Sequence, residues 1–415
     1  MKIFLIYFFL FAFWAENSLG FKLTDIPGLS LFNLSVYLLI IAWAYSIVFK
    51  VRVFISNQVN FYLVILIFYV IFSIVLNMFL DEFPRISIKS ELITFKTWLN
   101  PFLIFFIITN IIDDVKTCNR SLMGLIILLF VTALSTPLIS LGVIDIGTTY
   151  FFYKGRAAGF AEPNQYAGYL VLFIPFVMTY VLFTKRLIYK NASIILLVVS
   201  FLALITTGSR GGIFSFVASV LFYLMILNRK KMIQLPTLVA TIFIVCLLAA
   251  ISFHFAPSEV KETVSERLDP TKSESIEEYT AGRLKAWRNG IQLFVQKPIL
   301  GHGQKTFTYL MEKQFGMHLA AHNQYLNYLV QFGLIGFMLF VGLFLKIFLV
   351  FWKQQELIRD LWTQKLCIGY LAGFIGYCIS MLGVNMSNPR YIFWFYTAII
   401  LRYTQLQING EKVTE

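Results

Sequence analysis

Charged residues are scarce in this chain. Only 13% of its 415 residues are Asp, Glu, Lys or Arg, and 59% are hydrophobic. A soluble globular domain is nearer a quarter charged and half apolar. The composition therefore argues against an ordinary soluble protein and favours membrane spans of about 20 residues each. The 44 Phe and 21 Tyr residues suit helix surfaces that face lipid and its interface.

The sequence also lacks paired cysteines and a complete set of metal ligands. The four cysteines form no Cys-x-x-Cys pair, and three of them (Cys246, Cys367 and Cys378) lie within apolar runs. Two of the four histidines, His318 and His322, have His-x-x-x-His spacing, but the sequence has no His-Glu-x-x-His motif and no carboxylate cluster beside them. The acidic residues at 259–278 have the spacing of a solvated helix face. The sequence therefore predicts no disulfide framework, no metal site and no cofactor.

A formal net charge of +13 could indicate a nucleic-acid partner. The basic residues are instead scattered in short loops between apolar runs. This distribution favours contact with anionic lipid headgroups or a polyanionic substrate, and no nucleic-acid partner is expected.

Apolar runs divide the chain from end to end and are too long for the strands of a membrane β-barrel. Because unpaired backbone groups are costly in hydrocarbon, the runs should be helices. The predicted fold is an all-α integral membrane protein with about 12 transmembrane helices. The runs cover residues 3–15, 31–49, 58–79, 93–112, 121–142, 165–183, 191–207, 211–228, 236–255, 323–351, 364–384 and 391–403.

The loops between the runs predict the orientation. One alternating set of loops is richer in Lys and Arg, for example at Lys116, Lys185 and Lys230. The positive-inside rule places this set in the cytoplasm, together with both termini. The loops after the fifth, seventh, ninth and eleventh runs then face outside. The first run could also be read as a signal peptide ending near Gly20, but the topology favours a retained span.

One loop, residues 256–322, is much longer than the others. It begins with a polar, acidic segment and continues with a stretch in which Leu284, Trp287, Ile291 and Phe294 recur at helical spacing. We expect a helix on the membrane surface, with Thr280 as its N-cap.

The chain is predicted to have three regions. These are N-terminal helices in 1–150, a core in 151–345 that includes the long outer loop between the ninth and tenth helices, and C-terminal helices with a tail in 346–415.

Four polar patches fall on the predicted outer face. They are Gly155–Asn164, Thr207–Gly212, Ala281–Phe307 and His322–Gly336. In the second, Arg210 sits in a tight glycine-rich turn between two apolar runs. A guanidinium wedged there needs an anion or a set of carbonyls, although an arginine extending to lipid phosphate would also fit.

The third and fourth patches each contain one further candidate. Arg283 is in the first turn of the surface helix with Trp287 one turn later, an arrangement that suits a diphosphate; a surface arginine near Glu277 and Glu278 is the plain alternative. His322 precedes a long apolar helix, where a neutral imidazole could act as a general base or have only a structural role.

Taken in order, these patches resemble the O-antigen ligase and polymerase family. The matching segments are Arg156–Asn164, Ser209–Gly211, Gly282–Trp287, Gly301–Phe307 and His322–Gly336. The resemblance covers roughly residues 150–345. His302, at the variable place in Gly-x-Gly, departs from the small apolar residue that the family often has there, which leaves open which imidazole matters.

The resemblance implies a membrane glycosyltransferase of the GT-C type in the bacterial inner membrane. Such an enzyme takes a glycan from undecaprenyl diphosphate at the periplasmic surface and passes it to an acceptor hydroxyl without a metal. By the same resemblance, Arg210 and Arg283 are expected to bind the diphosphate, and His322 to orient or deprotonate the acceptor. The other motif residues expected to contact substrate are Arg156, Asn164, Ser209, Trp287, Asn323 and Tyr325.

Several functions remain open at this point. The acceptor could be lipid A-core for a ligase, another lipid-linked glycan for an O-antigen, capsule or exopolysaccharide polymerase, or a protein such as pilin. A polytopic transporter or a flippase of lipid-linked glycan is the alternative of another class. A transporter would be expected to show two related halves and polar residues at mid-membrane, whereas here the polar groups gather at one surface.

Overall fold

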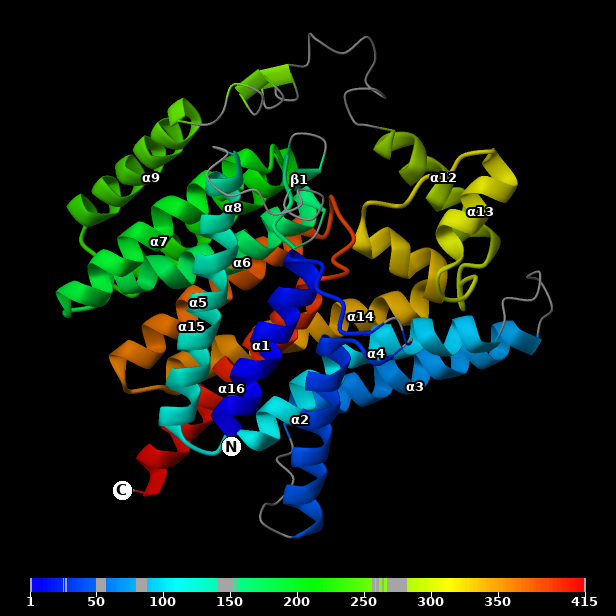
Figure 1. The fold of residues 1–415 in the computed structure, drawn as a ribbon, viewed down its shortest axis with the longest axis horizontal. Coiled ribbons are helices and arrows are strands. Elements are labelled where there is room, and N and C mark those ends of the chain that lie inside the picture. Colours follow the sequence, from blue (N-terminus) through cyan, green and yellow to red (C-terminus); the bar gives the residue numbers. More distant parts are fainter. Residues whose placement is uncertain are drawn as a thin grey trace.

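The structure is a computed structural model dominated by helices (Figure 1). It describes residues 2–24, 26, 28–49, 57–79, 88–140, 152–153, 156–160, 162–255, 258, 261–262, 265–266 and 282–413. Several residues named above lie outside this described part, namely Gly155, Glu277, Glu278, Thr280 and Ala281, together with most of the acidic segment 259–278.

Each of the predicted apolar runs overlaps one long helix. These helices are α1 (Lys2–Ser18), α2 (Leu31–Val48), α3 (Gln58–Phe79), α4 (Ile88–Ile111), α5 (Val115–Ser140), α6 (Pro163–Phe183), α7 (Leu187–Thr206), α8 (Arg210–Arg229), α9 (Leu235–Phe255), α14 (Gln324–Leu357), α15 (Leu361–Ser380) and α16 (Pro389–Val413). Within the described residues, 8 helices are long and apolar enough to cross a membrane. The chain is a multi-pass membrane protein with an all-α bundle, and the larger number of spans stays a prediction.

Close helix packing in the bundle depends on glycines of α15. A side chain at Gly373 would collide with the backbone of Leu172 on α6, and one at Gly369 with Thr179 on the same helix. Small residues at such spacing let membrane helices approach closely. Hydrogen bonds add to the packing, because Ser219 Oγ on α8 donates to the Ala372 carbonyl at 2.7 Å.

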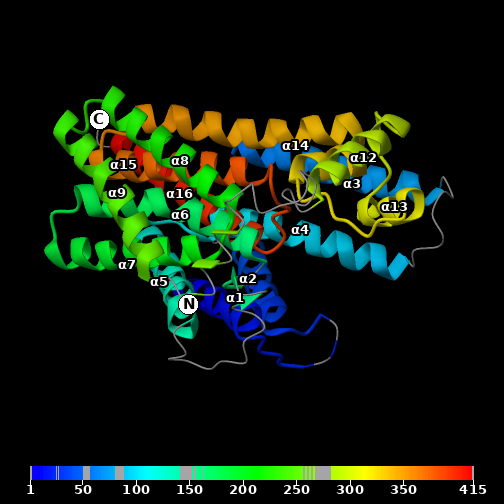
Figure 2. The same cartoon turned by 90° about the horizontal axis from the view of Figure 1, so that it is seen from above.

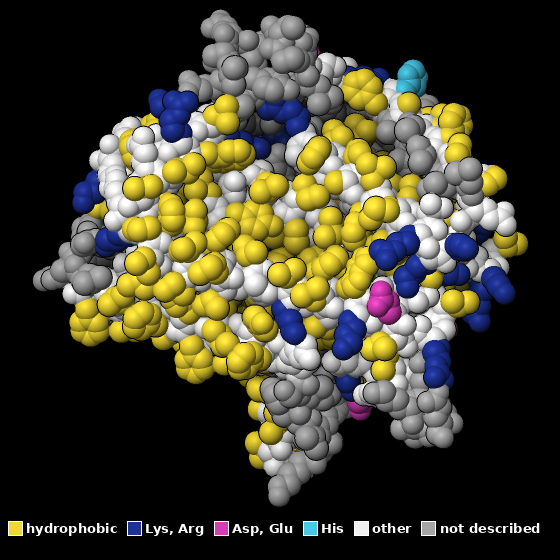
Figure 3. Space-filling model, turned by 180° about the vertical axis from the view of Figure 1, so that it is seen from behind, with side chains coloured by type: hydrophobic (Ala, Val, Ile, Leu, Met, Phe, Trp, Pro, Cys, Tyr) yellow, Lys and Arg dark blue, Asp and Glu magenta, His cyan; other side chains and the backbone are white. Residues whose placement is uncertain are grey.

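The outer surface of the bundle matches a membrane environment. Hydrophobic side chains cover a broad band across the face shown in Figure 3, and Lys and Arg lie mainly toward its margins. This pattern agrees with an apolar belt bordered by headgroup-contacting cations.

Hydrogen bonds among the helix ends and loops stabilise one end of the bundle. Asn388, just before α16, donates to the Phe160 carbonyl at 3.2 Å, and Ser387 Oγ donates to Gln165 on α6 at 2.8 Å. The first amide of α14, from Gln324, donates to the Met381 carbonyl at the end of α15 at 2.8 Å. We call this the site end.

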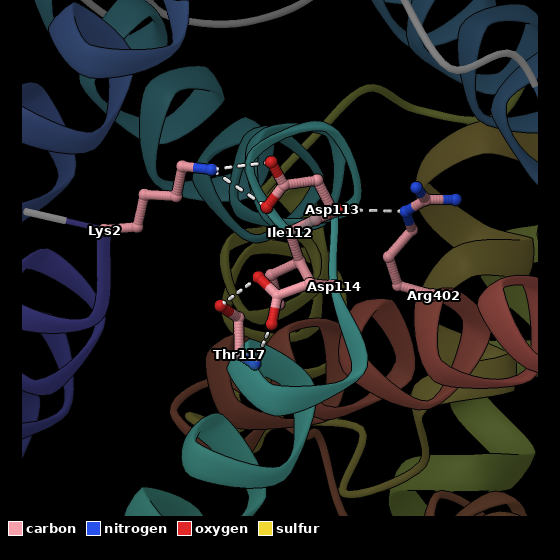
Figure 4. A network of polar contacts seen from close by, with 6 residues as sticks. All are labelled: Lys2, Ile112, Asp113, Asp114, Thr117 and Arg402. Atoms are coloured by element: carbon pink, nitrogen blue, oxygen red, sulfur yellow. Dashed lines mark hydrogen bonds and ion pairs between the residues drawn. The ribbon is translucent and has the colours of Figure 1, made fainter.

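The other end, here called the terminal end, gathers the start of α1 and the last turns of α16. Lys2 Nζ lies 2.8 Å from both carboxylate oxygens of Asp113, in the turn between α4 and α5 (Figure 4). Arg402 Nε on α16 donates to the Ile112 carbonyl in the same turn at 2.9 Å. The described ends of the chain therefore lie on the side of the bundle away from the site end (Figure 1), as the predicted topology requires.

Two shorter helices, α12 (Arg283–Gln296) and α13 (Thr306–Phe315), pack together beside the start of α14 (Figures 1 and 2). The predicted surface helix is thus present as α12, and its buried face includes Ala286 and Leu293. Two residues of the predicted apolar stripe are exposed, Leu284 at 41% and Ile291 at 54%, and Val295, one turn after Ile291, is 66% exposed. This exposed apolar face is what a helix lying on a membrane surface presents to lipid.

A break in α14 holds this pair of helices in place. Gly333 has φ +63° and interrupts the helix. The carbonyls of Val330 and Gln331 accept the amides of His302 and Gly303 at 2.9 and 2.8 Å. Beyond the break, Leu334 donates to the Pro298 carbonyl at 2.8 Å. The Gly-His-Gly loop therefore satisfies backbone groups that the break leaves open.

A two-residue hairpin precedes α6. Its strands are β1 (Phe152–Tyr153) and β2 (Arg156–Ala157), paired antiparallel with Tyr153 opposite Arg156. This hairpin brings Arg156 to the site end.

Candidate functional site

The turn between α7 and α8 fixes Arg210 as the first residue of α8. Gly208 has φ +55°, and Ser209 Oγ caps the helix by accepting the Gly212 amide at 3.2 Å. A side chain at Gly212 would collide with Ala167 on α6, so glycine lets α8 start close to that helix. The guanidinium is thus carried at a helix N-terminus, where the helix dipole and backbone amides favour anions.

Arg283 approaches from α12 at the same end of the bundle. It follows Gly282, which has φ +71°, and its side chain is half-buried beside Gly383 in the α15–α16 loop. Burial lowers the pKa of the Arg283 guanidinium below its usual value; Glu162 opposes this shift and Arg210 adds to it. An arginine stays protonated in spite of such a shift, so two positive charges act on one another here and favour the binding of an anion.

His322 lies directly before α14 and is close enough to Arg283 to feel its charge. Its backbone has φ +44°, an uncommon conformation for a residue other than glycine and one found preferentially at functional sites. Burial lowers the pKa of the imidazole, Arg283 lowers it further, and Glu162 raises it. At neutral pH the ring is therefore largely neutral and able to accept a proton.

Neighbouring side chains fix the backbone around His322. Trp287 on α12 donates its indole N–H to the Ala321 carbonyl at 2.9 Å. Asn323 Oδ1 accepts the amides of Tyr325 and Leu326 at 3.0 and 3.1 Å and caps α14. The phenol of Tyr325 donates to the Cys378 carbonyl at 2.9 Å. Trp287, Asn323 and Tyr325 thus position the segment around His322, and Ser209 positions the turn before α8. The substrate contacts predicted for these four residues stay predictions.

Arg156 and Asn164 are also nearly buried and form a chain of contacts. Arg156 Nε donates to the Thr207 carbonyl at 2.6 Å, in the turn that carries Arg210. Its Nη2 donates to Asn164 Oδ1 at 3.1 Å, and Asn164 in turn donates to Glu162 Oε1. The two loops at the site end are therefore tied together through Arg156.

Glu162 is a residue of this site to which the motif analysis gave no role. It acts electrostatically on both Arg283 and His322. A signal was present in the sequence, since Glu162 is the sole Asp or Glu between Asp145 and Glu259. A single carboxylate among the cations of the outer patches is unusual enough to single out.

The other two loop histidines have different surroundings. His302 is 4% exposed, and its Nε2 lies 2.7 Å from the Leu293 carbonyl of α12. His318 is exposed and pairs with Glu312 at 3.1 Å. Across the described residues, no group of three or more His, Cys, Asp or Glu side chains is arranged to hold a metal ion. The imidazole that shares the site with the two arginines is that of His322.

Comparison with known families agrees with these motifs. Residues 195–341 match the family model described as O-antigen ligase. The match includes Arg210, Arg283 and His322, whereas Arg156 and Glu162 lie before it. No curated protein matches the chain. The predicted resemblance to the O-antigen ligase and polymerase family is thus confirmed, and the family suggests glycosyltransferase activity of the ligase or polymerase type on lipid-linked glycans.

Proposed function

We propose that this protein is a glycosyltransferase that moves a glycan from undecaprenyl diphosphate to an acceptor hydroxyl at the periplasmic face of the bacterial inner membrane. The observation that carries the proposal is the meeting of Arg210, Arg283 and His322 at one end of the bundle, from three separate elements. Two guanidinium groups and a neutral imidazole supply what such a transfer needs, namely a site for an anionic leaving group and a proton acceptor.

The two arginines bind and neutralise the diphosphate of the donor. A guanidinium can bind phosphate oxygens in bidentate fashion, and the N-terminus of α8 adds its own positive potential. As the bond between the anomeric carbon and the phosphate oxygen breaks, its electron pair goes to the diphosphate. Stabilising that developing charge lowers the barrier, because the positive groups are already in place before reaction.

His322 accepts the proton of the acceptor hydroxyl. The acceptor oxygen attacks the anomeric carbon on the face opposite the diphosphate and forms the new glycosidic bond with inversion. Undecaprenyl diphosphate leaves, and the imidazolium returns its proton to water. No metal ion or nucleotide sugar is required by this scheme, since diphosphate is already a competent leaving group.

The test compares Arg210→Gln and Arg283→Gln with Arg288→Gln, an exposed arginine on α12. Each purified protein is reconstituted in proteoliposomes with a lipid-linked glycan and an acceptor. The two site variants should lose transfer roughly 100-fold or more, and Arg288→Gln should keep it. Normal transfer by folded Arg210→Gln or Arg283→Gln protein would refute the assignment.

Three acceptor classes fit this chemistry, and surface glycans separate them. In a strain lacking the gene, loss of all polymer linked to lipid A-core identifies a ligase. Retention of single repeat units identifies a polymerase of O-antigen, capsule or exopolysaccharide. Loss of glycan from pilin or another protein alone identifies a protein O-oligosaccharyltransferase.

A further inference from the structure

We infer that Glu162 is a positioning residue of the transfer site, whose carboxylate balances Arg283 while the donor is absent and supports His322 as proton acceptor during transfer. This inference rests on the proposed function. It goes beyond that function by giving a part to a side chain outside the matched family region, and it predicts opposite effects on donor binding and on turnover.

The position of Glu162 is tightly fixed. Its Oε1 accepts from Asn164, which is held by Arg156, and Arg156 is itself anchored on the Thr207 carbonyl. Pro163 follows directly as the first residue of α6 and restricts the backbone at that point. The carboxylate therefore cannot simply turn away into water.

The second carboxylate oxygen of Glu162 is unusual in its lack of a hydrogen bond. Glu162 Oε2 is buried and makes no hydrogen bond with any residue in the described part of the chain. A buried, unbonded oxygen of an ionised group is costly, so its presence at a site points to a partner that arrives with substrate. The hydroxyl-rich glycan and the imidazolium formed during transfer both offer hydrogen-bond donors.

An ordinary helix-capping role does not account for this side chain. Glu162 has the extended backbone of an N-cap residue (φ −67°, ψ 144°), yet its side chain makes no capping hydrogen bond to α6. Its charge acts instead on groups of other elements, Arg283 on α12 and His322 before α14. Arg210 on α8 completes the set of charges, through its effect on Arg283.

The carboxylate has two opposing effects on the reaction. It raises the proton affinity of His322 against burial and Arg283, which makes the imidazole a better base. It also repels the diphosphate, and it can attract Arg283 again as undecaprenyl diphosphate leaves. Glu162 thus weakens the binding of the anionic product and assists turnover.

The experiment uses Glu162→Gln in the full-length protein, with Glu312→Gln as control. Glutamine removes the charge but keeps an oxygen that can accept from Asn164, so the fold should persist. Glu312 is an exposed carboxylate that also pairs with a histidine, His318. The readouts are the rate of glycan transfer as a function of pH and the affinity for undecaprenyl diphosphate.

Glu162→Gln should reduce turnover about tenfold or more, move the acid limb of the pH–rate profile to lower pH, and bind undecaprenyl diphosphate several-fold more tightly. Glu312→Gln should change none of these. Glu162→Asp keeps the charge and should recover much of the turnover and the acid limb; it also serves as the test if the glutamine variant is not recovered folded.

Two outcomes would overturn the inference. One is a Glu162→Gln protein with the acid limb and product affinity of the wild type, and the other is a Glu162→Asp protein as impaired as Glu162→Gln. If Arg283→Gln abolishes transfer in the same assay, the proposed function stands and only the role of Glu162 fails. If Arg283→Gln also has no effect, the proposed function itself fails.

Discussion

At the scale of single residues, the polar side chains of the site end differ in how their atoms are used. The side chains of Trp287 and Asn323 form hydrogen bonds with the backbone on either side of His322. Arg156 and Asn164 form a buried chain that ends at Glu162. Arg283 and His322 are half-buried, and the charge of Arg283 acts on the imidazole. The first two pairs support the site, and the last pair is placed to meet a substrate.

The pH dependence of transfer tests the role given to His322. Burial and Arg283 lower the pKa of the imidazole below its usual value near 6.5. The ring is protonated, and cannot accept a proton, only below that lowered pKa. Activity should therefore rise with pH through an acid limb below pH 6.5. Arg283→Gln, assayed at its residual rate, should move this limb to higher pH because a positive neighbour is lost.

The control for this prediction is His318→Gln, which alters an exposed histidine paired with Glu312. It should leave the pH–rate profile unchanged. An acid limb that survives in His322→Gln at the wild-type rate would show that another group accepts the proton.

At the scale of elements, the break in α14 is the feature that places the site. Gly333 and Gly301 both have positive φ, and a side chain at either one would collide with the backbone of the other segment. The loop that ends α12 and the start of α14 are therefore locked at a fixed spacing. His322 and Arg283, carried by these two elements, depend on that spacing.

Alanine at either glycine should be strongly destabilising. The left-handed backbone alone costs an alanine about 1–2 kcal/mol, and the collision adds to this. We expect Gly333→Ala and Gly301→Ala each to lower the thermal unfolding temperature in detergent by several degrees. Gly342→Ala, on the same helix with open space around it, should be neutral or slightly stabilising. Equal unfolding temperatures for Gly333→Ala and Gly342→Ala would contradict this view of the break.

The limits of the sequence as a guide are clearest at this scale. Long apolar runs predicted the bundle helices closely because hydrocarbon leaves the backbone no alternative. The break at Gly333, the short helix α13 and the hairpin β1–β2 were not predicted, since each depends on contacts with distant segments. The inward face of α12 was not predicted for the same reason, because Ala286 and Gly290 are the residues that meet the neighbouring elements.

The site likewise contains residues that sequence motifs predict and residues whose role depends on contacts between distant segments. Arg210, Arg283 and His322 were predicted from motif order, and the structure brings them together. The role of Glu162 depends on a chain of hydrogen bonds from Thr207, which no local pattern encodes. His302 was left open in the sequence because a Gly-His-Gly loop gives no indication that its imidazole turns toward the Leu293 carbonyl.

At the scale of the whole molecule, the decisive property is that the reactive groups share one end of the bundle. Arg210 in the turn at 207–212, Arg283 and His322 meet at the site end, whereas Lys2, Asp113 and Arg402 meet at the terminal end. A common active site requires this arrangement. The positive-inside rule adds the prediction that the site end faces the periplasm.

Cysteine labelling tests this orientation. In a background with the four native cysteines replaced by alanine, Lys305→Cys and Lys313→Cys should react with a membrane-impermeant maleimide in spheroplasts. Lys116→Cys and Arg229→Cys, exposed at the terminal end, should react only after the membrane is permeabilised. Labelling of Lys313→Cys and Lys116→Cys from the same side would contradict the arrangement.

The helix α12 links the height of the site residues to the height of the lipid headgroup layer. Its outward face carries Ile291 and Val295, while its first residue is Arg283 and its indole at Trp287 holds the segment before His322. A helix seated in the headgroup layer moves with that layer when the bundle tilts or the bilayer thins. If α12 lies in that layer, as we predict, the guanidinium and the imidazole stay level with the lipid phosphates, at the height where the proposed polyprenyl-anchored donor would present its own.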